Sequence, residues 1–388
     1  MVNVVFHTAF VGDLILAVPF LRHVKRLWPD DQLILVCREG ISDFFTENKI
    51  VDKVLTVNKN SSHSKIKILV SELNCLEIRN LFSPHQSFRS AWILKNVSAL
   101  NKISYKQWWN NLFFTHRIVR NPNLPEALRL GQLITAVLDT TKLRRGADAD
   151  TRQILEPILN EYSNPRLRTS GLLPKIPKLW SLAVSPQRET ILHITKKLNI
   201  TDPFVVVSPG SQWFTKMWKK SGFVDLVQSL YKKGFNVYIT GSNSEKIICK
   251  EIAGLAAISL RQHGESQKDI ISAANVKCEI RSIAGETSLS ELHALLSRAQ
   301  FAITNDNGTM HLAAAASCPA VSIFGPTTLE LGYRPWSDSA FVAQIDLPCR
   351  PCGRHGHNKC PLGTHDCMKK LNVHEVVQAV ETLEAILE

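Results

Sequence analysis

A polar turn followed by a small-residue helix, between Thr304 and Ala315, has the residues best suited to binding an anion. Gly308 allows a tight turn, Thr309 can cap the helix, and the alanines that follow let the helix pack closely against a sheet. The N-terminus of such a helix carries backbone N–H groups and a partial positive charge, which together suit a phosphate. His311 falls in the first turn and can reach the same anion. An ordinary turn followed by a buried polar histidine is the alternative.

Lys216 lies in a second polar loop, between a strand that ends near Ser208 and a helix that begins near Phe223. An ammonium group there can lie beside a diphosphate. Together with a helix N-terminus it can neutralise a leaving group without a divalent metal, and the chain has no carboxylate pair that resembles a magnesium-binding motif. Lys219 and Lys220 follow closely, so a solvated surface lysine is the alternative.

Two carboxylates follow glycine turns at the start of expected helices. Asp13 can cap the first helix by complementing its dipole, or it can act as a general base on an acceptor hydroxyl, a role worth about 10²–10⁴-fold in rate. Glu245 follows the turn that begins at Gly241 and can accept hydrogen bonds from ribose hydroxyls, or it is an exposed helix-start glutamate. Neither GxGxxG nor GxxxxGK[ST] occurs, which disfavours dinucleotide-dependent enzymes and P-loop NTPases.

Four cysteines are clustered towards the end of the chain, with three histidines between them: Cys349, Cys352, Cys360, Cys367, His355, His357 and His365. Four thiolates can bind one zinc ion tetrahedrally as a structural clip. The second pair is spaced more widely than in common zinc ribbons, so a reduced thiol cluster, an incidental disulfide and an iron–sulfur ligand set are the alternatives. The cluster has no expected part in catalysis.

These residues follow the ends of strands in a repeated strand, loop and helix pattern. In the first half we expect strands at 2–6, 33–37 and 54–57 and a helix at 14–27. In the second half we expect strands at 204–208, 236–240, 301–304 and 320–324 and helices at 223–232, 288–299, 309–317 and 373–387. Strands and helices that alternate in this way predict parallel sheets covered on both faces, hence an α/β fold.

Length and composition agree with two folded domains. The chain has 388 residues, 44% of them hydrophobic and 21% charged, and its nine cysteines are too few and too scattered for a secreted disulfide scaffold. A proline-containing stretch at 164–185 is the expected linker, with an interdomain cleft as the expected site. The longest apolar stretch, 14–21, is far shorter than the roughly 20 residues that span a bilayer, and no signal peptide is evident, so we expect a cytoplasmic protein.

The positive charge is concentrated in the first half. Residues 1–185 contain 25 Lys and Arg against 15 Asp and Glu, whereas residues 186–388 contain 21 against 19. This asymmetry predicts that one domain meets a polyanion or an anionic membrane surface, unless the basic surface only aids solubility. No nucleic-acid recognition motif is present, so we expect no nucleic-acid partner.

Residues 87–120 combine basic and aromatic side chains: Arg89, Lys95, Lys102, Lys106, Arg117 and Arg120, with Trp92, Tyr105, Trp108, Trp109, Phe113 and Phe114. Because Trp and Tyr favour lipid interfaces, we expect an acceptor or membrane-surface contact here, with Arg89, Lys95 and Lys102 as acceptor-binding residues. A buried helix face with solvated lysines is the alternative.

Four motifs together resemble one family: Gly12-Asp13-Leu14 through Pro19, Pro209-Gly210-Ser211 with Lys216 and Trp218, Asp306 through His311, and Phe324-Gly325-Pro326-Thr327. In order and rough spacing they resemble glycosyltransferase family 9, which includes bacterial ADP-heptose:lipopolysaccharide heptosyltransferases. The resemblance extends from residue 1 to about residue 370. It implies a GT-B fold, in which two Rossmann-like domains face each other across a cleft. We assign these to residues 1–175 (acceptor) and 186–372 (nucleotide sugar), followed by a helix at 373–388.

The resemblance also implies a reaction, namely metal-independent transfer of a heptose from ADP-heptose, with inversion, to the lipid A core oligosaccharide. By motif position Asp13 matches the catalytic base, Lys216 the diphosphate contact and Glu245 the ribose contact. The remaining donor-binding positions are these: Asp306, Gly308, Thr309 and His311 in the donor-sugar and phosphate loop, Ser211 as a phosphate-side hydroxyl, and Thr287 in the backbone wall near the nucleotide base. Asn307 departs from the family, which usually has Ser or Thr there.

The expected reaction needs no cofactor, and zinc at the cysteines is structural only. We expect peripheral contact with the cytoplasmic face of the inner membrane, where the lipid acceptor lies. Two alternatives remain. The chain can be a related glycosyltransferase that acts on another glycan or on a protein such as an autotransporter, or it can be a non-catalytic protein that binds a nucleotide sugar.

Overall fold

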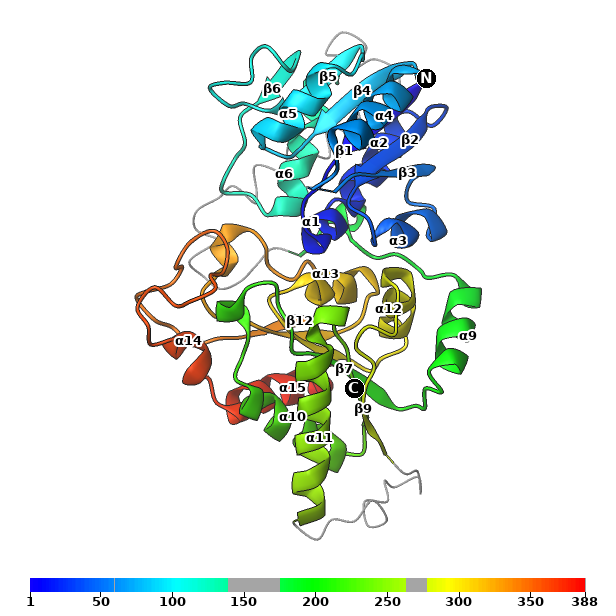
Figure 1. Ribbon diagram of the computed structural model, residues 1–388. Coiled ribbons are helices and arrows are strands. Elements are labelled where there is room, and N and C mark those ends of the chain that lie inside the picture. The colour runs from blue at the N-terminus through cyan, green and yellow to red at the C-terminus, as the bar shows by residue number, and fades with distance from the viewer. Residues whose placement is uncertain (59, 139–174, 263–277, 388) are drawn as a thin grey trace. The chain divides into compact units, whose positions relative to one another are not determined.

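The computed structural model describes residues 1–388 except 59, 139–174, 263–277 and 388 (Figure 1). The described chain forms two compact units. Unit 1 comprises Met1–Ser181 and Glu330–Arg334, and unit 2 comprises Leu182–Leu329 and Pro335–Glu388. The expected linker at 164–185 lies outside the described residues up to residue 174.

Unit 1 is built on a six-stranded parallel sheet of order β3-β2-β1-β4-β5-β6. Its strands are β1 (Val2–Phe6), β2 (Gln32–Cys37), β3 (Lys53–Thr56), β4 (Ile78–Ser83), β5 (Asn101–Tyr105) and β6 (His116–Ile118). The central strands are runs of apolar residues because helices cover both faces of the sheet.

The helices of unit 1 are α1 (Val11–Leu16), α2 (Val18–Leu27), α3 (Ser42–Glu47), α4 (His63–Asn74), α5 (Phe88–Lys95) and α6 (Glu126–Gln132). Leu73 of α4 and Leu94 of α5 pack in one core with strand residues such as Val4. The single helix expected at 14–27 is interrupted at Ala17. The cause is Pro19, which lacks an N–H group and whose ring collides with the carbonyl one turn earlier in a continuous helix.

Unit 2 contains a second six-stranded parallel sheet, of order β12-β11-β10-β7-β8-β9. Its strands are β7 (Phe204–Ser208), β8 (Asn236–Ile239), β9 (Ile280–Ser282), β10 (Ala302–Asn305), β11 (Ala320–Ile323) and β12 (Ala340–Ala343). The alternating strand and helix pattern in the sequence is therefore confirmed in both units.

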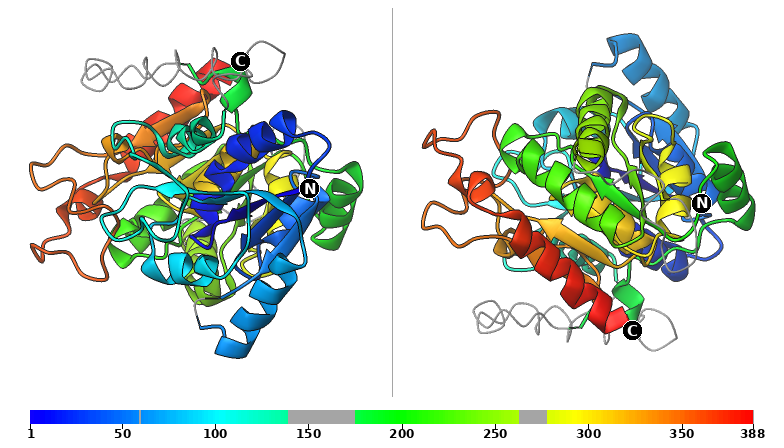
Figure 2. Two further views of the ribbon diagram at one scale, coloured as in Figure 1. Left: turned by 90° about the horizontal axis from the view of Figure 1, so that it is seen from above. Right: turned by 90° about the horizontal axis from the view of Figure 1, so that it is seen from below.

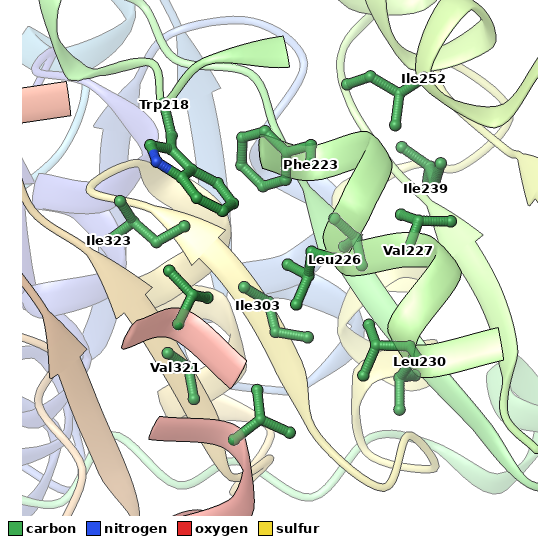
Figure 3. Packing of buried hydrophobic residues seen from close by; sticks show 14 of the residues in the cluster. Trp218, Phe223, Leu226, Val227, Leu230, Ile239, Ile252, Ile303, Val321 and Ile323 are labelled. Carbon is green, nitrogen blue, oxygen red and sulfur yellow. The ribbon is translucent and has the colours of Figure 1, made fainter. Parts of the chain in front are cut away.

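The helices of unit 2 are α9 (Arg188–Lys197), α10 (Lys220–Lys232), α11 (Lys246–Gln262), α12 (Leu289–Leu296), α13 (Gly308–Ala315), α14 (Asp366–Lys369) and α15 (Val373–Leu387). Trp218, Phe223 and Leu226 pack against Ile303 and Val321 of the sheet (Figure 3). The last helix, treated as a separate segment in the sequence, runs beside α10 (Figure 2) and contributes to this same core. It belongs to unit 2 because its apolar face is covered there.

Both sheets reverse their direction of winding between two neighbouring strands. In unit 1 the reversal lies between β1 and β4, and in unit 2 between β7 and β10. Loops that leave the carboxyl ends of such a pair run to opposite sides, so a space opens between them where ligands bind in this fold class. Asp13 follows β1 in unit 1, and in unit 2 Lys216 follows β7 and Asp306 follows β10.

Candidate functional site

The candidate site of unit 2 is formed by the loops that follow β7 and β10. The first loop carries Lys216 at the end of a short 3₁₀ helix, Phe214–Lys216, and the second begins α13. Asn305, a buried side chain at the end of β10, joins the two ends of the first loop. It donates to the Pro209 carbonyl at 2.6 Å and accepts from the Trp218 N–H at 3.2 Å. The loop that holds Lys216 is therefore fixed to the sheet.

Lys216 and Asp306 form an ion pair at the centre of this site. The Lys216 Nζ lies 2.6 Å from Asp306 Oδ2, and the Thr327 hydroxyl donates to the same oxygen at 2.6 Å. Both side chains are largely buried, at 13% and 5% exposure. The two residues assigned separately to a donor therefore bind each other here. Removing one partner of a buried pair leaves an unpaired charge, at a cost of about 3–5 kcal/mol.

His311 lies beside this ion pair as an uncharged ring. It is buried, and among the described residues its Nδ1 has no hydrogen-bond partner. Burial lowers the pKa of His311 to about 4; Asp306 acts to raise it and Lys216 to lower it further. At neutral pH the ring can therefore give or accept a hydrogen bond, but it adds no positive charge for an anion.

The N-terminus of α13 is capped by Asn307 and not by Thr309, so the expected cap is corrected. Asn307 Oδ1 accepts from the Met310 N–H at 3.2 Å, and Asn307 Nδ2 donates to the Gly210 carbonyl at 2.7 Å. Thr309 lies inside the helix and accepts a hydrogen bond from the Ser208 hydroxyl. The departure from the family residue thus gives a good cap that also joins the two loops.

A cavity of about 610 Å³ opens beside the first loop, lined in part by Ser211, Ser242 and Glu245. Glu245 accepts hydrogen bonds from the Ser242 N–H and hydroxyl, both at 2.7 Å. A Cβ on Gly210 would lie 1.9 Å from Glu245 Oε1, so only glycine allows this carboxylate to lie there. Thr287 is half-buried just before the start of α12, and it is not among the residues that line this cavity.

The cysteine-containing segment, residues 349–367, braces the loop that carries Lys216. Thr215 donates through its N–H and its hydroxyl to the His357 carbonyl, at 3.0 and 2.9 Å. The His365 ring contacts the Thr215 carbonyl at 2.9 Å, and His355 stacks on Trp213. Two histidines expected near a metal therefore make backbone hydrogen bonds, and the segment supports the position of Lys216.

Asp13 lies at the winding reversal of unit 1, in the first turn of α1. Its Oδ2 accepts from the Phe10 N–H at 3.1 Å, so the capping interpretation is confirmed. The Arg38 guanidinium lies 4.7 Å from the Phe10 ring centre and donates to the Thr8 carbonyl. Burial lowers the pKa of Arg38, and the nearby Asp13 carboxylate opposes that shift.

Comparisons with known proteins agree with this arrangement of motifs. A family model described as "Glycosyltransferase family 9 (heptosyltransferase)" matches residues 173–361, which include both loops of the unit 2 site. Over these residues the chain is similar to glycosyltransferase family 9.

Curated heptosyltransferases are similar to the chain at low identity. Lipopolysaccharide heptosyltransferase 3 of Escherichia coli K12 is 22% identical over 84% of this chain and 83% of its own length. Lipooligosaccharide heptosyltransferase 2 of Haemophilus ducreyi is 29% identical over 82% of each chain. Lipooligosaccharide heptosyltransferase 2 of Campylobacter jejuni is 27% identical over 50% of this chain, a match that spans 57% of that relative.

Solved heptosyltransferase structures have the same fold. ADP-heptose LPS heptosyltransferase II of E. coli has a TM-score of 0.72 at 18% identity, covering 99% of this chain and 98% of its own. The E. coli heptosyltransferase WaaC with ADP has a TM-score of 0.64 at 15% identity, covering 99% and 100%. The expected GT-B fold, with two Rossmann-like sheets, is confirmed. Across the described parts of the chain, no helix is long and apolar enough to cross a membrane.

The four thiols of the cysteine-containing segment influence one another. Burial raises the pKa of Cys367 to about 11, and the neighbouring thiols of Cys352, Cys360 and Cys349 add to that rise. Burial also acts to raise the pKa of Cys360, but backbone hydrogen bonds from Leu362, Gly363 and His365 and the side-chain hydrogen bond from Thr364 outweigh it and lower the value. Within the described ranges, no three His, Cys, Asp or Glu side chains are arranged to hold a metal ion. Zinc at this segment stays a prediction.

The three basic residues assigned to an acceptor have different surroundings. Arg89 and Lys95 are exposed on α5, and the Lys95 Nζ lies 5.3 Å from the centre of the Trp92 ring. Lys102 instead donates to the carbonyls of Leu94 and Lys95 at 3.1 Å, so it caps the end of α5. Burial lowers the pKa of Lys102. Its first role is to hold the helix, which its position in the sequence did not indicate.

Other residues near the two sites were not found from the sequence. In unit 1, His7 and His85 follow β1 and β4, and His85 Nδ1 contacts the Ser90 hydroxyl at 2.9 Å. Burial lowers the pKa of His7 to about 3, and His85 adds to this effect. In unit 2, Thr327 lies in a recognised motif but had no assigned role. The available signal for His7 was its position directly after the strand expected at 2–6, and for Thr327 its place at the end of a motif; no strand was expected before His85.

Proposed function

We propose that this chain transfers a heptose from ADP-heptose to the inner core of lipopolysaccharide, with inversion and without a catalytic metal. The observation that carries the proposal is the Lys216–Asp306 pair beside the capped N-terminus of α13, at the point where the unit 2 sheet reverses its winding. This combination suits a diphosphate because a cation and backbone N–H groups lie at the mouth of a nucleotide-binding fold. The relatives named above support heptose as the sugar.

The donor-side residues have distinct proposed roles. Lys216 and the backbone of Gly308 and Thr309 stabilise the negative charge on the departing ADP. Lys216 does so by exchanging part of its contact with Asp306 for the phosphate. Glu245 accepts hydrogen bonds from the ribose hydroxyls at the cavity beside Gly210. The cation and the helix N-terminus supply the charge compensation that a divalent metal supplies in other transferases.

On the acceptor side, the proposed base is Asp13. Its carboxylate removes the proton from an acceptor sugar hydroxyl while that oxygen forms a bond to the anomeric carbon of the heptose. The bond between this carbon and the diphosphate oxygen breaks, and ADP leaves with the electron pair. Attack from the face opposite the leaving group inverts the configuration. The proposed acceptor is the lipid A core oligosaccharide, at the cytoplasmic face of the inner membrane.

The test is a transfer assay with ADP-heptose and lipopolysaccharide truncated before its inner-core heptoses. We expect release of ADP and a mass increase of one heptose on the lipid, both unchanged by a metal chelator. Candidate protein acceptors, including autotransporters, and heptose-containing glycans form parallel arms. Transfer to one of these alone would replace the proposed acceptor. Binding of ADP-heptose without release of ADP to any acceptor would instead favour a non-catalytic binding protein.

We also propose a structural zinc ion for the four thiols, separate from the chemical step. It requires this segment to rearrange, since no three His, Cys, Asp or Glu side chains among the described residues are arranged to hold a metal ion. Metal analysis of protein purified without chelator tests the idea. Less than about 0.2 zinc per chain would end it, because a structural site with four thiolate ligands is filled at purification.

A further inference from the structure

We propose that α5 and the connection between β5 and β6 form a surface by which unit 1 binds an anionic lipid bilayer. We call this surface the aromatic face and define it by four side chains: Phe88, Trp92, Trp108 and Leu112. Its biological purpose rests on the proposed function, since a lipid-linked acceptor lies in a bilayer. Its test uses no transfer reaction, so the two proposals can fail separately.

The aromatic face exposes large apolar groups to an unusual degree. Trp108 is 91% exposed and Leu112 83%, the two highest values for large apolar side chains in the part of the chain that the structure describes. Phe88 and Trp92 on α5 are 55% and 54% exposed. Single exposed apolar residues are normal on a protein surface, but a group of them marks an interaction site.

The face is held in place by ordered structure. The Phe88 ring lies 6.0 Å from that of Trp92 and 5.3 Å from that of Trp109, which joins α5 to the β5–β6 connection. The buried Asn110 donates to the Tyr105 carbonyl at 2.8 Å and accepts from the Gln107 N–H at 3.0 Å. Phe114 is buried in the core. These anchors on both sides of Trp108 and Leu112 keep the two side chains outside.

The part of the sequence that carries the aromatic face has basic residues and no acidic ones. Residues 78–125 contain seven Lys and Arg side chains and no Asp or Glu, whereas residues 1–77 contain nine of each kind. The charge excess of the first half is therefore concentrated in the segment that carries the aromatic face. Four of the seven are exposed: Arg89, Lys95, Lys106 and Arg117. They lie on α5, on β6 and just after the end of β5, and these elements lie together in unit 1 (Figure 1).

This combination fits a bilayer surface better than a soluble partner. Tryptophan prefers the depth of the lipid headgroups, where its ring is apolar and its N–H remains hydrated. Basic residues near an anionic leaflet each add about 1 kcal/mol of attraction. The opposite side of α5, with Ala91 and Leu94, is buried in the core, so the helix lies flat and inserts only its outer side chains. A free acidic glycan would make no use of Leu112.

The experiment is flotation of the full chain with vesicles of phosphatidylcholine alone or with 30% phosphatidylglycerol. We expect binding only to the anionic vesicles, and weaker binding as salt is raised. Replacing the two most exposed residues, Trp108→Ala with Leu112→Ala, should lower the partition coefficient by about tenfold or more, since each buries an apolar side chain on binding. Arg89→Gln with Lys95→Gln should lower it by a similar factor at low salt only.

Matched controls come from unit 2. Leu192→Ala with Ile258→Ala removes side chains that are 59% and 52% exposed, and Lys250→Gln removes an exposed charge. These variants should bind like the wild type. Melting temperatures should stay unchanged throughout because every substituted side chain is exposed. As a direct readout, brominated lipid should quench tryptophan emission, and Trp92→Phe with Trp108→Phe should remove that quenching without weakening flotation.

Three results would overturn the proposal. The first is that the double variant Trp108→Ala with Leu112→Ala floats with anionic vesicles as well as the wild type does. The second is equal binding to neutral and anionic vesicles. The third is an absence of vesicle binding together with self-association in sedimentation that the same double variant abolishes, which would assign the aromatic face to a second copy of the chain.

Discussion

Unit 1 and unit 2 have the same strand order but different chemistry at the point where each sheet reverses its winding. In unit 2 the reversal holds a buried ion pair, a capped helix and a glycine that admits a carboxylate. In unit 1 it holds two histidines and Asp13, whose carboxylate acts to raise the pKa of Arg38. A shared backbone plan therefore fixes where a site lies, and the loops decide what it does.

The difference has a chemical sense under the proposed function. A site for a diphosphate needs positive charge that is already in place, and unit 2 provides it on a rigid loop. A site for a sugar hydroxyl needs a carboxylate that can take up a proton, and Asp13 lies where the unit 1 sheet reverses its winding. Five substitutions or conditions can break or sharpen this comparison.

The largest expected effect is at the proposed base of unit 1. Asp13→Asn should reduce the rate of transfer by about 10²–10⁴-fold, the usual contribution of a general base. Binding of ADP to unit 2 should not change. The amide oxygen can still accept from the Phe10 N–H, so the cap of α1 is kept. Asp43→Asn, in the first turn of α3, is the matched control and should leave the rate unchanged. Near-normal turnover of Asp13→Asn would remove the assigned role.

Lys216→Ala should have the next largest effect, a loss of about 10²–10³-fold in kcat, as expected when a preorganised charge is removed from a leaving group. Because it also leaves Asp306 buried without its cation, the double variant Lys216→Ala with Asp306→Asn is needed. It should recover the free energy of unfolding but not the rate. Lys219→Ala, in the same loop, should retain activity, since its Nζ contacts the Lys369 carbonyl. Recovery of the rate in the double variant would contradict the role of Lys216.

Gly210→Ala tests the carboxylate of the cavity. A methyl group there meets Glu245 Oε1 at 1.9 Å, so the glutamate must move. Overpacking of this kind costs about 1–3 kcal/mol, and we expect ADP affinity measured by calorimetry to fall roughly tenfold to a hundredfold. Gly254→Ala in α11 is the control, because a Cβ at that position has no neighbour within 4 Å. Equal affinities for the two variants would show that Glu245 does not contact the nucleotide.

Both units should lose stability in acid through a buried histidine. The pKa of His7 is lowered to about 3 and that of His311 to about 4, from the ordinary 6.5. Below pH 6.5 these two histidines become protonated in the unfolded chain but stay neutral in the folded chain. The free energy of unfolding therefore falls as pH drops from 6.5 towards 4. The slope is about 1.4 kcal/mol per pH unit for each ring. His7→Gln and His311→Gln should each flatten the urea-denaturation profile over that range, unlike exposed His63→Gln.

The smallest expected effect concerns the cap of α13. Asn307→Ala removes the bond to the Met310 N–H and the bond to the Gly210 carbonyl, and should lower the free energy of unfolding by about 1 kcal/mol or slightly more. Asn307→Ser keeps a capping oxygen and should cost less. Ser288→Ala removes the cap of α12 alone and serves as the reference. If Asn307→Ala costs less than Ser288→Ala, the side chain does not join the two loops.

The sequence predicted the elements whose signal is local. The strands β1 and β7 and the helix α15 begin and end where the apolar pattern placed them. The break between α1 and α2 was missed because the apolar pattern continues through it, although Pro19 was a usable sign. The candidate site shows the same limit. Its residue types could be named from motifs, but the bond between Thr215 and His357 joins positions 142 residues apart, and no spacing rule predicts it.

The cap of α13 shows a second limit. Thr309 and Asn307 are both good capping residues, and the sequence alone cannot say at which one the helix begins. The position of Gly210 decides it, because Asn307 can also reach the Gly210 carbonyl. Likewise the sequence indicates that Lys102 is a surface charge, whereas in the structure its Nζ donates to a carbonyl at the end of α5. In both cases a partner from another loop, not the residue type, fixes the role.

Residues 330–334 belong to unit 1, although the chain on both sides of them belongs to unit 2. This has a consequence for any attempt to study the two units in isolation. Arg129 is almost fully buried in unit 1, where it pairs with Glu126 and donates to the Leu331 carbonyl at 3.0 Å. The Glu126 N–H donates to the Gly332 carbonyl at 2.9 Å. A fragment truncated after Ser181 would lack both carbonyls. The buried guanidinium of Arg129 would then lose one of its hydrogen-bond acceptors. The N-terminal half is thus completed by five residues from far downstream, and severing the chain once cannot yield two self-sufficient pieces.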